Sequence, residues 1–213
     1  MKIVDGFIAT IKNSAPALIE LAKDLGEVAL DHGAGDDAFK EIPIIGTLIS
    51  MHKLGNSISA ALFEIKLNRF LSEVDDVSNQ ERIDFLDKHC TDAEAINHLG
   101  ASTLMVLDKI DHPQLASMLG KAFALMIMEV IDRASFDMYC HVIKNLNSYL
   151  IQQMHNLFKI EYSISGDVPA VVFLANLGLF YLEKMPTYVG ATEMPSGTYR
   201  KTSFGIEFYK NVM

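Results

Sequence analysis

Two adjacent pairs of soft metal ligands are the residues whose types most readily suggest chemistry. His89 precedes Cys90, and Cys140 precedes His141. Four such side chains could in principle form a tetrahedral zinc site. Neighbouring residues of a helix, however, point about 100° apart, so both members of one pair rarely reach the same ion. We therefore interpret the cysteines as core residues beside surface histidines and predict no metal site.

Other signatures of catalysis are missing from the sequence. It has no G-x-S-x-G nucleophile motif, no G-x-x-x-x-G-K-[ST] phosphate loop and no H-E-x-x-H zinc motif. The acidic turn at 31–37 lacks the regular carboxylate spacing of a calcium loop. Most other carboxylates lie at expected helix starts and turns, where they favour helix N-termini. We predict no catalytic residue and no cofactor, and hence a protein that is not an enzyme.

Composition and charge narrow the class of protein. The chain has 213 residues, of which 50% are hydrophobic and 21% charged, as in globular proteins. Its net charge of −9 disfavours non-specific binding to nucleic acid or anionic lipid. Two cysteines make no disulfide framework, and Asp5 and Lys12 interrupt the apolar N-terminus, unlike a signal peptide. We expect a cytoplasmic protein, with membrane association as the alternative.

An apolar segment at 113–133 is the element that should organise the fold. Residues 122–128 include no polar side chain, and a helix that is apolar on every face must be covered on every face. Lys121, Glu129, Asp132 and Arg133 leave the uncharged run far shorter than a bilayer requires. The segment is therefore predicted to be the central helix of a bundle.

The N-terminal 30 residues carry an apolar stripe with alternating spacings of four and three, typical of a packed helix pair. The favoured interpretation is packing on the protein's own bundle, because most amphipathic helices pack internally. The alternative is contact with a protein partner or a second copy. The contact residues would then be Ile8, Ile11, Leu18 and Leu25.

A second apolar run, at 42–63, is long enough to span a bilayer. His52, Lys53 and Asn56 lie at its middle, where each would be costly in lipid. A buried helix with a break near Gly55 is the default interpretation. The alternative is a membrane-active effector that inserts this segment, and its lipid-facing residues would be Ile44, Ile45, Leu48 and Ile49.

Helix starts and the C-terminal elements can also be predicted. Capping boxes at Ser78–Glu81 and Thr91–Glu94 should begin two helices, and Ser135 should begin a long one reaching to about 160. Pro169 and Gly178 should bound a short helix. Strands are expected at 179–184 and 198–204, followed by a terminal helix. The fold class is thus mainly α: a multi-helix bundle at 1–160 with a small α+β module at 161–213.

The C-terminal segments NLGLFYLEK (176–184), GTYRKTSFG (197–205) and EFY (207–209) resemble the end of a winged-helix domain. The whole chain resembles a group of uncharacterised bacterial helical proteins, through IPIIGTL (42–48) and the charged helix start at 75–85. EVIDRASFD (129–137) faintly resembles the TerB-type bundle, without its acidic metal motif. These resemblances imply a winged-helix-like C-terminal module and a setting in stress response or phage defence, and no activity.

A winged helix would imply DNA binding, which the residues of this module disfavour. The expected recognition helix, VPAVVFLANL (168–177), has no Lys, Arg, Gln or Ser to read base edges. Residues 161–213 carry four basic and five acidic side chains, so a phosphate backbone would not be attracted. Only the adjacent Arg200 and Lys201 could contact phosphate, and nucleic acid is not an expected partner.

The sequence therefore favours a non-enzymatic interaction module that docks a protein partner or forms a homo-oligomer. Its contact surfaces would be the N-terminal stripe and the loop tip at 186–196. A membrane-active effector using 42–63 is the first alternative. A winged-helix transcription regulator is the second.

Overall fold

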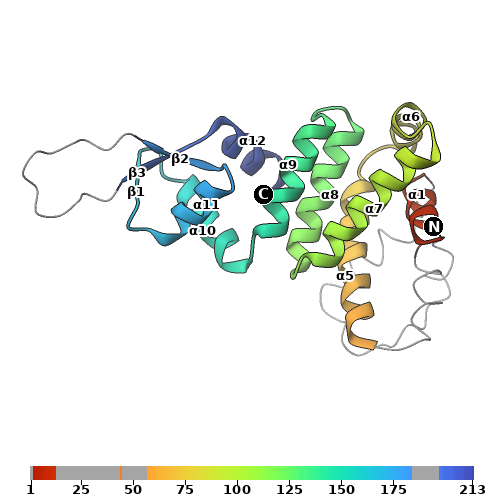
Figure 1. The fold of residues 1–213 in the computed structure, drawn as a ribbon, viewed down its shortest axis with the longest axis horizontal. Helices are drawn as coiled ribbons and strands as arrows, with labels where there is room; N and C mark the ends of the chain where they lie inside the picture. The colour runs from red at the N-terminus through yellow and green to blue at the C-terminus, as the bar shows by residue number, and fades with distance from the viewer. Residues whose placement is uncertain (1, 13–43, 45–56, 184–196) are drawn as a thin grey trace, which may run out of the picture. The chain divides into compact units, whose positions relative to one another are not determined.

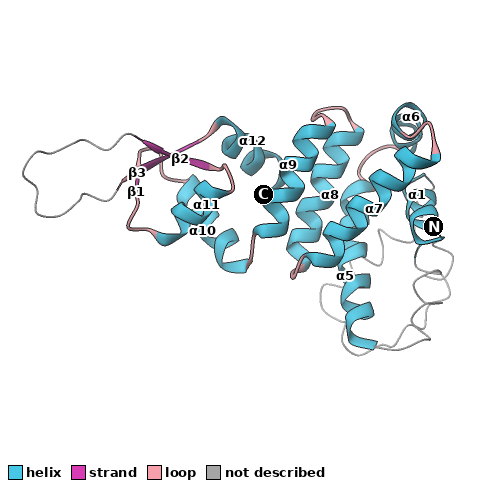
Figure 2. Ribbon diagram, in the orientation of Figure 1, coloured by secondary structure: helices cyan, strands magenta, loops and turns pink. Residues whose placement is uncertain are grey.

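The computed structural model describes residues 2–12, 44, 57–183 and 197–213. Within them the chain forms nine helices and three short strands (Figures 1 and 2). The fold is mainly helical with a small antiparallel sheet near the C-terminus, which confirms the predicted fold class at this level. The chain divides into two compact units, 1–140 and 141–213. The predicted boundary at 160/161 lies inside the second unit, because helix 148–158 packs on helix 169–176.

The first unit is helical. Its elements are α1 (Lys2–Lys12), α5 (Ser57–Val74), α6 (Asn79–His89), α7 (Ala93–Lys109), α8 (Pro113–Ile127) and the first part of α9 (Arg133–Asn145). Helix α8 packs along α5, and α1 packs against α6 and α7. Gly120 permits the close approach of α8 to α5, because a Cβ there would lie 2.5 Å from the Phe70 carbonyl oxygen.

Four aromatic rings form the centre of this unit. Phe7, Phe70, Phe123 and Phe136 come from α1, α5, α8 and α9, and neighbouring ring centroids lie 5.4–6.3 Å apart. Edge-to-face and tilted arrangements at these distances are favourable. Ten of the fifteen residues of α8 are buried, so the prediction of a core helix in this segment is confirmed.

The helix ends differ from the predictions in four places. The central helix ends at Ile127, not Arg133, and the long helix predicted from Ser135 is two helices, α9 and α10 (Ser148–Phe158). The backbone N–H of Ser135 donates to Asp132 at 2.8 Å, so Asp132 caps α9. The cap of α7 is Asp92 rather than Thr91, because its carboxylate accepts from the Ala95 N–H. The capping box at Ser78 is confirmed, with both reciprocal bonds present.

The second unit combines helices with the sheet. After α10 come β1 (Ile164–Ser165), α11 (Pro169–Asn176), β2 (Phe180–Glu183), β3 (Thr198–Lys201) and α12 (Ser203–Val212). The strand order is β1-β3-β2, with both pairs antiparallel and Tyr199 opposite both Ile164 and Leu182. The two strands expected from the sequence are present. The short strand β1 was not predicted.

Candidate functional site: a pocket in the helical unit

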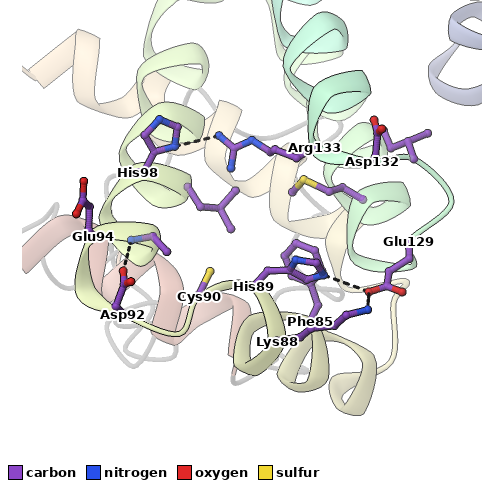
Figure 3. Close-up of a pocket in the computed structure, with 14 residues that line it drawn as sticks. Phe85, Lys88, His89, Cys90, Asp92, Glu94, His98, Glu129, Asp132 and Arg133 are labelled. Atoms are coloured by element: carbon purple, nitrogen blue, oxygen red, sulfur yellow. Dashed lines mark hydrogen bonds and ion pairs between the residues drawn. The ribbon is translucent and has the colours of Figure 1, made fainter.

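A pocket of about 730 Å³ lies among α6, α7 and the turn from α8 to α9 (Figure 3). Pockets that hold ligands usually fall in this range of volume. Four side chains form what we call the apolar floor: Phe85, Leu99, Met126 and Ile131. Charged and polar groups surround them, so the pocket offers both apolar contact and ionic recognition.

Short connections place α6 and α7 at the pocket. Cys90 ends α6, with its N–H donating to the Leu86 carbonyl, and Asp92 begins α7 two residues later. Lys88, His89 and Cys90 therefore come from the end of one helix, while Asp92 and Glu94 come from the start of the next. The carboxylates at the start of α7 lie where the helix dipole favours negative charge.

The turn after α8 is a Schellman motif with an unusual residue in it. The N–H of Val130 donates to the Leu125 carbonyl at 2.9 Å, and that of Glu129 to the Met126 carbonyl at 3.1 Å. Glu129 has φ 55°, the left-handed conformation that normally favours glycine. Among the described residues it is the only one besides glycine with a positive φ.

The Glu129 carboxylate joins this turn to α6. Its Oε1 lies 2.5 Å from Lys88 Nζ and 3.1 Å from His89 Nε2 (Figure 3). Hydrogen bonds from Lys88 and then His89 lower the pKa of Glu129, so the group is charged at neutral pH. A strained backbone held at a pocket is consistent with a role beyond packing.

Arg133 joins α9 to α7 on another side of the pocket. Its Nε donates to Asp137 at 3.0 Å, and its Nη2 donates to His98 Nδ1 and to Ser102 Oγ, both at 3.3 Å. Because arginine only donates, His98 Nδ1 is the acceptor in this arrangement. Both basic side chains of the pocket, Arg133 and Lys88, are thus already bound to carboxylates of this chain.

Cys90 lines the pocket and lies between Asp92 and His89 in the view of Figure 3. It is half-buried, and burial raises its pKa, although the positive charge of Arg133 opposes the shift. Nucleophilic cysteines typically have a lowered pKa, which is the opposite of the direction at Cys90.

No protein-family model, curated protein or solved structure matches this chain. The geometry of the pocket therefore supplies the functional argument.

The two His/Cys pairs do not form a metal cluster in the described part of the chain. Cys140 is buried within α9, whereas His141 is exposed. The His89 ring is bound to Glu129 and lies tilted against Phe85, with ring centroids 4.8 Å apart. Among the described residues, no three His, Cys, Asp or Glu side chains are grouped so that they could hold an ion.

The structure places the predicted stripe residues of α1 inside the chain's own core. Ile8 and Ile11 are 8% and 1% exposed, on the helix that packs against α6 and α7. A Cβ on Gly100 of α7 would lie 2.7 Å from Val4 Cγ1, so the two helices approach closely there. Leu18 and Leu25, like the loop tip at 186–196, lie outside the described residues.

Residues 57–63 of the segment predicted for membrane insertion form the start of α5, and of its four predicted lipid-facing residues the structure describes only Ile44. This residue is fully buried, and its N–H donates to Thr10 Oγ1 at 3.4 Å. Ile45, Leu48 and Ile49 lie outside the described residues. Of the helices that the structure describes, none combines the length and hydropathy required to cross a bilayer.

The two candidate phosphate-binding residues make contacts within the second unit. Arg200 Nε lies 2.9 Å from Glu183 Oε1, and the two residues are on neighbouring strands. Lys201 Nζ donates to the Phe158 carbonyl at 2.8 Å and lies 5.6 Å from the centroid of that ring. These contacts give both cations a structural role.

Sequence reasoning missed the pocket. Its residues come from three separate segments, and the α8–α9 turn was predicted to be continuous helix because Glu129 stands where glycine would have marked a break. The one available signal was the pair of capping motifs at 78–94, because two helix starts so close together imply a short connection between α6 and α7.

Proposed function

We propose that this protein is a non-enzymatic interaction module that binds a protein partner through the pocket of its helical unit. The observation that carries the proposal is a pocket that combines an apolar floor with charged side chains in ion pairs of the chain's own. Lys88 is bound to Glu129 and Arg133 to Asp137, so contacts within the chain favour one orientation of these groups before a partner arrives. Such preorganisation lowers the entropic cost of binding.

The state of the reactive groups also supports binding rather than chemistry. The pKa of Cys90 is raised by burial, and the His98 ring accepts a hydrogen bond from Arg133 instead of facing a nucleophile. The His89 ring is bound to Glu129. A general base would need to be oriented toward a nucleophile or a substrate proton. A bacterial setting in stress response or phage defence rests on the sequence resemblance alone.

The test is a pull-down of the tagged protein from its own host at native expression. Ile131→Glu places a charge in the apolar floor, and Val130→Glu is the matched control, because Val130 is 62% exposed and does not line the pocket. We expect a stoichiometric protein partner with the wild type and the control, and its loss with Ile131→Glu. Circular dichroism melts establish that both variants remain folded.

Other outcomes of the same experiment would refute the proposal. Co-purifying lipid without a protein partner would support the membrane-active alternative, and nucleic acid in the ultraviolet spectrum would support the regulator. A partner retained equally by all three proteins would place the interaction elsewhere on the molecule.

A further inference from the structure

The charges of the pocket that have no counter-ion are all negative. Asp92, Glu94 and Asp132, which we call the acidic rim, are exposed and line the pocket. In the described part of the chain none of the three forms an ion pair, whereas both basic residues of the pocket do. An incoming anion would meet three carboxylates that are paired with no cation, and an incoming cation would meet complementary charge.

The acidic rim occupies two opposite sides of the pocket. Asp92 and Glu94 lie on the side of α7, and Asp132 lies across from them at the start of α9 (Figure 3). The residues of the apolar floor come from α6, α7, α8 and the turn that follows α8. Asp92 and Asp132 are both N-caps, bound to the N–H groups of Ala95 and Ser135, so their positions are fixed by the helices.

This distribution of charge specifies the chemistry of a ligand. A chain with apolar side chains at its middle and cations on both flanks would cover the floor and reach both sides of the rim. A volume of about 730 Å³ accommodates side chains of a peptide segment. The net charge of −9 would also attract such a segment over a distance.

We propose that the pocket docks a segment of a partner protein in which Lys or Arg residues flank one or two apolar side chains. This inference rests on the proposed function and adds the chemistry of the partner.

The first step of the test is selection from a random twelve-residue peptide library displayed on phage, against the full-length wild-type protein. We expect enrichment of peptides in which Lys or Arg flanks apolar residues. Failure to enrich any peptide, or enrichment of acidic or neutral ones, would overturn the inference.

The second step measures binding of the enriched peptide to two triple variants of equal net charge. Asp92→Asn, Glu94→Gln and Asp132→Asn neutralise the rim, and asparagine preserves the two helix caps. The control neutralises three exposed carboxylates that do not line the pocket, by Asp76→Asn, Glu161→Gln and Glu207→Gln. We expect about tenfold or greater weakening with the rim variant, a smaller salt dependence, and little change with the control. Equal weakening by both variants would refute docking at the rim.

Cys90 reports the place of binding. It lines the pocket and is half-buried, whereas Cys140 is buried, so a maleimide should label Cys90 first. Saturating peptide should slow labelling of Cys90, read by mass spectrometry of the digested protein, and unchanged labelling would contradict the proposal. A host partner whose pull-down is insensitive to the rim variant would leave the proposed function standing and refute this inference alone. The absence of both a partner and a peptide would refute both.

Discussion

Removing Asp75 should destabilise the helical unit strongly, because it would leave the Arg82 guanidinium buried without its carboxylate. Arg82 Nη1 lies 2.7 Å from Asp75 Oδ1, and the two side chains are only 2% and 6% exposed. Deleting one partner of a buried ion pair typically costs about 3–5 kcal/mol. The free energy of unfolding of a domain is about 5–15 kcal/mol, so the variant would lose a large part of its stability. The expected fall in Tm is about 6–20 °C.

Urea denaturation of Asp75→Ala measures this cost, and an exposed ion pair between α1 and α6 provides the control. Lys12 Nζ lies 3.0 Å from Asp87 Oδ1, with side chains 41% and 64% exposed, so Asp87→Ala should cost no more than about 1 kcal/mol. The double variant Asp75→Leu with Arg82→Met should recover much of the stability, because apolar residues of similar volume can replace a buried pair. A loss below about 1 kcal/mol for Asp75→Ala, or a double variant as unstable as the sum of the single ones, would refute the reasoning.

Two further predictions concern the contacts of α5. Gly120→Ala should lower the free energy of unfolding by about 1–3 kcal/mol in urea titrations, because the added Cβ would clash with the Phe70 carbonyl. An unchanged urea midpoint would contradict the tight contact between α5 and α8. Burial lowers the pKa of Lys66, and the negative charges of Asp108 and Asp111 oppose this shift. In the alkaline range just below the ordinary pKa of lysine, the unfolded chain therefore binds more protons than the folded protein. The stability of the wild type relative to Lys66→Met should therefore rise with pH through that window, and a flat difference would contradict it.

The secondary structure could be predicted where the signal is local. The capping box at Ser78 and the apolar surface of 113–127 depend on residues within one helix, and both appear as expected. Caps shifted where two candidates lay close together. Asp92 caps α7 in place of the predicted Thr91, and Asp132 caps α9 in place of the predicted Ser135. Asparagine, aspartate, serine and threonine are all strong N-caps, so the sequence does not show which of two nearby candidates begins the helix.

The site could not be predicted, for a different reason. Its floor joins residues from α6, α7, α8 and the turn that follows, and no periodicity within one segment reveals such a combination. The stripe at Ile8 and Ile11 has the same spacing whether it packs inside the chain or on a partner, and only the tertiary structure shows that these two side chains are internal. The short strand β1 has two residues, too few for an alternating pattern.

Glu129 has a left-handed backbone conformation in the α8–α9 turn, so the residue that best suits the backbone at this position differs from the residue that best suits the pocket. Glycine would relax the backbone, but it would also release Lys88 and His89 from their shared carboxylate and leave an uncompensated cation at the mouth of the pocket. Selection for stability alone would therefore convert position 129 to glycine, whereas selection for the pocket would retain an acid. In any related chain, the identity of the residue at this position would thus serve as a diagnostic marker of whether the pocket is still in use.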